Sequence, residues 1–174
     1  MAKLPNKVRK LDYGFLSIFS FWLFLVLISP LMLPENSIKD LSGTVNAIDN
    51  MESIANMNPI PAFVYWIGDI NCHQMATRSY FLNGNQMPFC ARDVGIFAGL
   101  VIGMILAIIF NLNPAFRILM VGVIPMMIDG TLQLLSPYES SNQMRLITGI
   151  IAGSSLAIIL HKVAIIIQNN VKPT

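Results

Sequence analysis

Charged residues are scarce in this sequence: they make up 11% of its 174 residues, against about 25% in an average soluble protein. The net charge of +2 is too small to indicate a protein that binds nucleic acid. The chain has two histidines and two cysteines, which excludes a metal cage built from several histidines. It also lacks a phosphate-binding loop, a pair of catalytic carboxylates and a nucleophile with a base at a recognisable spacing. No motif therefore names a reaction.

Hydrophobic residues, by contrast, make up 55% of the chain, and its mean hydropathy is +0.64. Four apolar runs match the roughly 20 residues that an α-helix needs to cross the hydrocarbon of a bilayer. These runs are residues 15–33, 94–112, 115–135 and 146–167. No repeat or low-complexity linker divides the chain. The sequence therefore predicts an all-α integral membrane protein, a four-transmembrane-helix bundle that forms a single domain over residues 1–174 in contact with the lipid bilayer.

The Lys and Arg residues between the spans predict the orientation, because the side that holds the excess is normally cytoplasmic. Seven lie on the side of the amino terminus and four on the other side. The first group is Lys3, Lys7, Arg9, Lys10, Arg117, Lys162 and Lys172, and the second is Lys39, Arg78, Arg92 and Arg145. We therefore expect a multi-pass protein of the cell (plasma) membrane with both termini in the cytoplasm.

The long segment 34–93 is then extracytoplasmic. Within it, the apolar stretch 60–70 is too short to span a bilayer, and it predicts a short interfacial helix in this outer loop. At the inner end of the fourth run, we expect His161 and Lys162 to reach the membrane surface rather than to form a site.

Glycines recur at intervals of four residues in two of the runs. Small residues at this spacing let the backbones of two membrane helices approach closely. They are Gly95, Gly99 and Gly103 in the second run, and Gly149 and Gly153 in the fourth. The second and fourth helices are therefore predicted to pack against each other.

Both cysteines, Cys72 and Cys90, lie in the outer segment, where an oxidising compartment permits a disulfide. The turn at Asn83-Gly84 could bring them together. A second interpretation is a zinc or copper site, because Cys72, His73 and Cys90 are suitable ligands with Asp93 as a fourth. Free thiols are a third. Asp93 also directly precedes the second apolar run and would serve as the N-cap of its helix.

Asp129 lies inside the third run, six residues before its end at residue 135, which is about 9 Å below the outer boundary. A carboxylate at such a depth usually has a partner within the bundle. Arg92 and Arg145 begin the second and fourth helices at matching depth, and Gln133 is one turn above Asp129. We therefore expect one polar network at the outer leaflet, which also includes Gln74, Arg78 and Asn142.

Two groups of motifs carry a resemblance to a known family. The first is Cys72-His73-Gln74, Arg78-Ser79, Gly84, Pro88 and Cys90-Ala91-Arg92-Asp93-x-Gly95, and the second is Asp129-Gly130-x-x-Gln133, Ser141-Asn142, Arg145 and Thr148-Gly149. From roughly Trp66 to Gly153 the sequence resembles the membrane proteins grouped as domain of unknown function number 2085, although Tyr80 stands where that family leads us to expect phenylalanine. The resemblance implies that these polar residues form one site in the outer leaflet, and it implies no activity.

Two classes of function follow. The first is an accessory, non-catalytic subunit, since no catalytic motif is present and the outer segment 34–60 has little of its own to pack against. Its expected partners are other integral membrane subunits, and analogy alone suggests an archaeal ammonia monooxygenase of the copper membrane monooxygenase type. The alternative is a small membrane enzyme or zinc- or copper-handling protein, which would use the cluster of Cys, His, Arg and Asp at the outer face.

Overall fold

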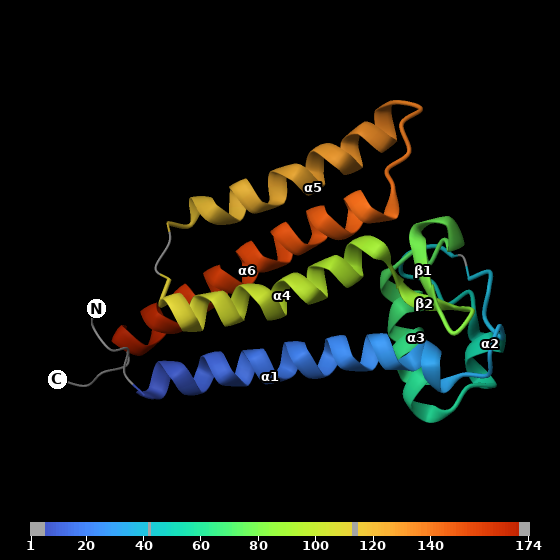
Figure 1. Ribbon diagram of the computed structural model, residues 1–174, viewed down its shortest axis with the longest axis horizontal. Helices are drawn as coiled ribbons and strands as arrows, with labels where there is room; N and C mark the ends of the chain where they lie inside the picture. The colour runs from blue at the N-terminus through green and yellow to red at the C-terminus, as the bar shows by residue number, and fades with distance from the viewer. Residues whose placement is uncertain (1–5, 42, 113–114, 171–174) are drawn as a thin grey trace.

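The computed structural model describes residues 6–41, 43–112 and 115–170. Four long helices run along one another, and a smaller folded segment covers one end of them (Figure 1). The long helices are α1 (Asn6–Ile28), α4 (Ala91–Phe110), α5 (Arg117–Leu135) and α6 (Asn142–Asn170). Each is long and apolar enough to cross a bilayer. The predicted four-helix membrane fold is therefore confirmed.

Three of these helices extend beyond the apolar runs that predicted them. α1 starts at Asn6, and a short 3-10 helix, η1 (Ser29–Met32), continues it through Pro30. α6 starts four residues early and ends three residues late. Hydropathy detects only the part of a helix that faces hydrocarbon, so the polar turns outside it are missed. α4 starts at Ala91 after the N-cap residue Cys90, so the interpretation of Asp93 as the N-cap was wrong.

The closest helix contact is between α4 and α6, which lie side by side in Figure 1. An added Cβ atom at any of the five predicted packing glycines would collide with the backbone of the other helix. Gly95, Gly99 and Gly103 lie against the carbonyl groups of Leu146, Ile150 and Ser154, while Gly149 and Gly153 lie against those of Arg92 and Ile96. The residue numbers on α4 and those of their contacts on α6 increase in the same direction, so the two helices run parallel.

The cap, which we define as residues 33–90, is not purely helical. It contains α2 (Met51–Ala55), α3 (Pro59–Asn71), a 3-10 turn η2 (Ala76–Arg78) and an antiparallel hairpin of β1 (Ser79–Leu82) and β2 (Asn85–Cys90). α3 corresponds to the predicted short helix. The hairpin was not predicted, although its turn was: Asn83 and Gly84 have φ of 54° and 69°, and two positive values are typical of the tight turn that suits the twist of two strands.

The cap has a core of its own. Leu33, Ile38, Leu41, Ile54 and Tyr65 are buried together. The side chains of two buried strand residues also hold the segment that follows α1: Asn85 Oδ1 accepts from the Ile38 amide at 2.9 Å, and Gln86 Oε1 accepts from the Leu41 amide at 2.9 Å. The expectation that the segment 34–60 has little of its own to pack against was therefore wrong.

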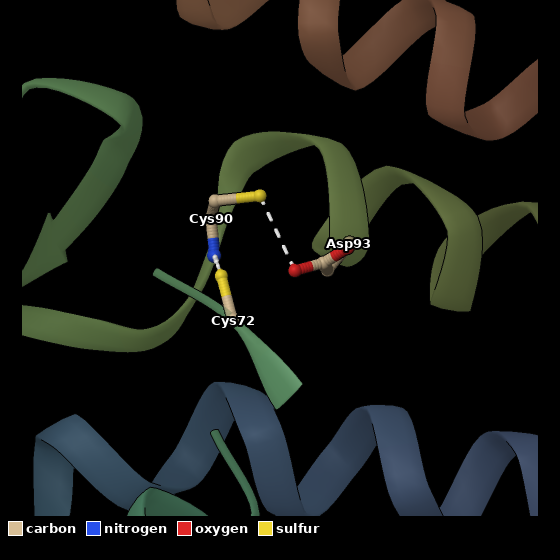
Figure 2. Close-up of side chains that lie close together, drawn as sticks. All are labelled: Cys72, Cys90 and Asp93. Carbon is tan, nitrogen blue, oxygen red and sulfur yellow. Dashed lines mark hydrogen bonds between the residues drawn. The ribbon is translucent and has the colours of Figure 1, made fainter. Parts of the chain in front are cut away.

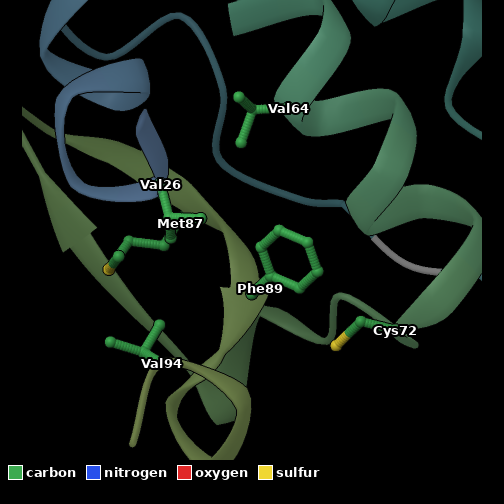
Figure 3. Packing of buried hydrophobic residues seen from close by; sticks show 6 residues of the cluster. All are labelled: Val26, Val64, Cys72, Met87, Phe89 and Val94. Carbon is green, nitrogen blue, oxygen red and sulfur yellow. The ribbon is translucent and has the colours of Figure 1, made fainter. Parts of the chain in front are cut away.

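A second buried cluster fastens the cap to the long helices. It joins α1, α3, β2 and α4 (Figure 3), and its members are Val26, Val64, Cys72, Met87, Phe89 and Val94. Phe89 makes edge-to-face contacts with Trp22 and Phe97, at centroid distances of 5.9 and 5.1 Å. Because Cys72 belongs to this cluster, its position relative to α4 is fixed by packing.

At the opposite end of the bundle, His161 of α6 and Asp12 of α1 form a buried pair. His161 is 0% exposed and Asp12 is 1% exposed, and Nδ1 of the histidine lies 2.9 Å from Oδ1 of the aspartate. His161 therefore does not reach the membrane surface, and that expectation was wrong. Its side chain points into the bundle because a carboxylate on the neighbouring helix provides the partner that a buried imidazole requires.

Candidate functional site

The hairpin and the start of α4 bring the two cysteines together. The sulfur atoms of Cys72 and Cys90 and a carboxylate oxygen of Asp93 all lie within 4.8 Å of one another. The Cys90 amide donates to Cys72 Sγ at 3.4 Å, and the Cys90 thiol donates to Asp93 Oδ2 at 3.2 Å (Figure 2). Both cysteines are free thiols in this structure. The predicted disulfide thus stays a prediction.

The two thiols differ in acidity because they interact with each other. A hydrogen bond from the Cys72 side chain lowers the pKa of Cys90. The same hydrogen bond raises the pKa of Cys72, and burial of that thiol acts in the same direction. Cys90 is also the less buried of the two. It is therefore the thiol from which a proton is more readily lost and which is more accessible.

His73 does not join this cluster. Its side chain is exposed, and its Nδ1 lies 3.3 Å from the carbonyl oxygen of Gly43. Among the described residues, the group with metal-ligand geometry consists of Cys72, Cys90 and Asp93 alone. The predicted ligand set with His73 is therefore not brought together, and a zinc or copper site stays a prediction.

A partly enclosed cavity of about 100 Å³ lies beside the thiols, between the cap and the ends of α4, α5 and α6. We call it the arginine pocket, after the three arginines among its lining residues. It is lined by Cys72, His73, Gln74, Met75, Arg78, Cys90, Arg92, Gln133 and Arg145. No aspartate or glutamate is among them. The sequence placed most of these residues in one polar network without indicating a cavity.

Arg92 has the acidic partner that the sequence suggested. Its Nη2 lies 2.6 Å from Oδ2 of Asp129, whose side chain is 5% exposed. Gln133 Nε2 and the Tyr138 hydroxyl also donate to this carboxylate, at 3.2 and 3.4 Å. The charge of Arg92 is thus balanced within the bundle.

Arg145 and Arg78 differ from Arg92 in this respect. Arg145 is 3% exposed, and it donates to the amide oxygens of Asn142 at 3.0 Å and Gln133 at 2.9 Å. Nε of Arg78 is buried and has no hydrogen-bond partner. Within residues 6–41, 43–112 and 115–170, neither guanidinium group has a carboxylate within 4.0 Å. Two positive charges therefore face the arginine pocket without an acidic partner.

Gln74 lines the pocket, and the hydrogen bonds of its side chain in the described structure go to residues of the cap and not to Asp129. Its backbone has φ of 45°, and its side-chain Nε2 donates to the Pro88 carbonyl at 2.8 Å. Gln86 in turn donates to the Gln74 carbonyl. Sequence analysis missed Asn85 and Gln86, although two adjacent amide side chains in a short apolar stretch were a signal that could have drawn attention to them.

Comparison with known proteins places the whole pocket within a recognised segment. Residues 72–159 match the family described as a predicted membrane protein, domain of unknown function 2085. An uncharacterized protein of Methanocaldococcus jannaschii is 42% identical over 95 residues, which are 52% of this chain and 61% of that protein. An uncharacterized protein of Methanothermobacter thermautotrophicus is 32% identical over 91 residues, or 51% of this chain and 82% of that protein.

This chain thus spans less than two thirds of the length of the first relative. No solved structure matches it. All the residues that line the arginine pocket lie inside the segment that matches the family, whereas Asp12 and His161 lie outside it. The chain belongs to the family of membrane proteins known as domain of unknown function 2085.

Proposed function

We propose that this protein binds an oxyanion, a phosphate or carboxylate group, in the arginine pocket at one end of its membrane-spanning bundle. The observation that supports the proposal is the imbalance of charge at the pocket. Three guanidinium groups surround it, and in the part of the chain that the structure describes only Arg92 has a carboxylate partner. A bound anion would balance the charges of Arg78 and Arg145.

Arg145 and the Nε atom of Arg78 are buried. A buried charge is costly unless an opposite charge and hydrogen bonds compensate for it. Among the described residues, Arg145 has two amide partners but no carboxylate within 4.0 Å, and Arg78 keeps a buried N–H group without an acceptor. Guanidinium groups bind phosphate and carboxylate through paired hydrogen bonds, so an oxyanion would satisfy both residues.

The size of the pocket suits a small oxyanion. One water molecule needs roughly 10–15 Å³ of such a cavity, so about 100 Å³ accommodates several heavy atoms. The anion could belong to a lipid headgroup, because arginines at the end of a membrane helix lie at the level of the phosphates. It could equally belong to a soluble molecule. Both sources share the same recognition chemistry.

The test is a calorimetric titration of the purified full-length protein in a neutral detergent. Inorganic phosphate represents the soluble source, and a short-chain phosphatidic acid represents the lipid source. We expect saturable binding of at least one of them. Arg78→Gln should raise the Kd about tenfold or more, since a hydrogen bond to a charged group contributes about 1.5–3 kcal/mol and 1.4 kcal/mol corresponds to a factor of ten.

Arg117→Gln is the control, because it also removes one positive charge but does so at an exposed position at the start of α5, at the opposite end of the bundle. Its Kd should equal that of the unmodified protein. Binding of phosphatidic acid without binding of phosphate would identify a lipid as the source. If neither phosphate nor phosphatidic acid binds, or if Arg78→Gln and Arg117→Gln lose affinity equally, the pocket is ruled out as an anion site.

We further propose that the pocket faces the outside of the cell. The excess of Lys and Arg near the end where α1 begins and α6 ends supports a cytoplasmic position for that end. In a Cys72→Ser/Cys90→Ser background, an impermeant maleimide applied to intact cells should label Ser136→Cys, beyond α5, and should leave Ala115→Cys, before α5, unlabelled. Both positions are exposed. The reverse pattern would place the pocket in the cytoplasm.

The predicted accessory-subunit role and the ammonia monooxygenase assignment gain no support. The names of the relatives mention no such complex, and the outer segment has its own core. A metal-handling role is disfavoured by electrostatics, because the guanidinium groups of Arg78 and Arg145, which have no carboxylate within 4.0 Å among the described residues, lie beside the thiols and repel a cation.

A further inference from the structure

The two thiols belong to the same pocket as the three arginines. Cys72 and Cys90 both line it, and their sulfur atoms lie within 4.8 Å of each other. Cys72 comes from the end of α3 and Cys90 from the end of β2, so two separate segments present them to one space (Figure 2). Any anionic molecule held by the arginines would therefore lie beside a pair of thiols.

The surroundings give the two thiols different roles. Cys90 is half-buried, and its thiol donates to the Asp93 carboxylate at 3.2 Å. This carboxylate is placed to accept the proton when Cys90 reacts. Cys72 is 6% exposed and accepts the Cys90 amide at 3.4 Å, so it is too enclosed to meet a large reagent but is adjacent to the Cys90 sulfur.

We propose that Cys72 and Cys90 undergo thiol–disulfide exchange with a small anionic disulfide bound in the arginine pocket. The Cys90 thiol passes its proton to Asp93, and its sulfur attacks one sulfur of the bound disulfide. A mixed disulfide on Cys90 forms, and the first half of the ligand leaves as a thiolate. Asp93 passes the first proton to the departing thiolate and then accepts the proton of the Cys72 thiol, whose sulfur lies within 4.8 Å of the carboxylate oxygen. The Cys72 sulfur attacks the Cys90 sulfur and expels the second half as a thiolate, which takes up this proton.

The reaction is balanced in electrons. The protein dithiol loses two electrons and becomes the Cys72–Cys90 disulfide, while the ligand disulfide gains two electrons and becomes two thiols. The reverse sequence would oxidise a dithiol ligand at the expense of the protein disulfide. The preference for an anionic ligand rests on the proposed anion binding, because Arg78 and Arg145 provide the unbalanced positive charge.

The test compares two small disulfides of similar size and opposite charge, dithiodiglycolate and cystamine, with the reduced full-length protein in neutral detergent. Mass spectrometry of the unreduced protein follows the formation of the Cys72–Cys90 disulfide. We expect dithiodiglycolate to react at least tenfold faster than cystamine. Arg78→Gln should lower this ratio about tenfold, whereas the control Arg117→Gln should leave it unchanged.

The order of the steps is tested separately. Cys72→Ser should stop at a single thioglycolate attached to Cys90, and Cys90→Ser should react more slowly than the unmodified protein. Inorganic phosphate should slow the reaction of the unmodified protein with dithiodiglycolate. Equal rates with both disulfides, or a charge preference that Arg78→Gln does not alter, would overturn the proposal.

The outcome is separable from that of the anion-binding experiment. If phosphate binds normally while the thiols do not react, the exchange is ruled out and the anion site stands. If neither phosphate nor phosphatidic acid binds and the disulfides react without charge preference, both proposals fail. If the thiols are blocked by a stoichiometric metal that a chelator removes, the metal-site interpretation replaces the exchange.

Discussion

Replacing His161 by phenylalanine should lower the free energy of unfolding by about 3–5 kcal/mol, the usual cost of removing one partner from a buried pair. The histidine is 0% exposed, and its Nδ1 lies 2.9 Å from the Asp12 carboxylate. In the variant this carboxylate stays enclosed between α1 and α6 without its partner. Thermal or denaturant unfolding in a fixed detergent measures the loss.

The double variant Asp12→Leu/His161→Phe separates the pair from the packing around it. Because an apolar pair often replaces a buried polar pair at little cost, we expect it to be more stable than the single variant His161→Phe. Lys10→Gln, an exposed change two residues from Asp12, should leave stability nearly unchanged. A single variant as stable as the unmodified protein would show that the pair does not hold α1 against α6.

The sequence alone does not reveal this pair. Asp12 and His161 are separated by 149 residues, and hydropathy gives the number of spans but not which helices touch. His161 stands beside Lys162 near the end of an apolar run, a position typical of side chains that reach the membrane surface. The rotation of α6 about its axis decides whether His161 reaches the membrane surface or points into the bundle. This rotation is set by the packing of glycines elsewhere on the helix.

Local signals predicted the cap in part. The Asn83-Gly84 turn could be recognised because both residues tolerate positive φ, and the short helix followed from an apolar stretch too short for a span. The strands beside the turn were missed since β1 has four residues and β2 contains a proline, which weakens the strand pattern. Tertiary contacts with α3 stabilise them, through the bond from the Tyr65 hydroxyl to the Gln86 carbonyl.

The candidate site was predictable where depth in the membrane limits which residues can pair with each other. Asp129 needed a partner at the same level, and Arg92 at the start of α4 is that partner at 2.6 Å. The absence of an acid beside Arg145 within 4.0 Å was not predictable, because Arg145 was an equally good candidate by depth. His73 looked like a ligand from its place beside Cys72, but neighbouring residues after a helix end point in different directions.

The glycine contacts between α4 and α6 give the second large effect. In Gly99→Ala, the added Cβ would lie against the Ile150 carbonyl and 2.8 Å from the Ser154 amide. These are backbone atoms of a helix and cannot move aside alone, so the two helices must separate. Overpacking of this kind costs about 1–3 kcal/mol, and we expect a loss of that size. Gly99→Leu should be more destabilising still, because its larger side chain prevents the close approach altogether.

Gly14→Ala is the matched control for this prediction. Gly14 is also inside a membrane-spanning helix, but a Cβ there has no heavy atom within 4 Å. Alanine is the better helix former by up to about 1 kcal/mol, so the control should be neutral or slightly stabilising. Thermal unfolding of the two alanine variants in the same detergent therefore isolates the steric contact from the helix propensity. If Gly99→Ala and Gly14→Ala unfold at the same temperature, α4 and α6 do not depend on the close approach that the glycines permit.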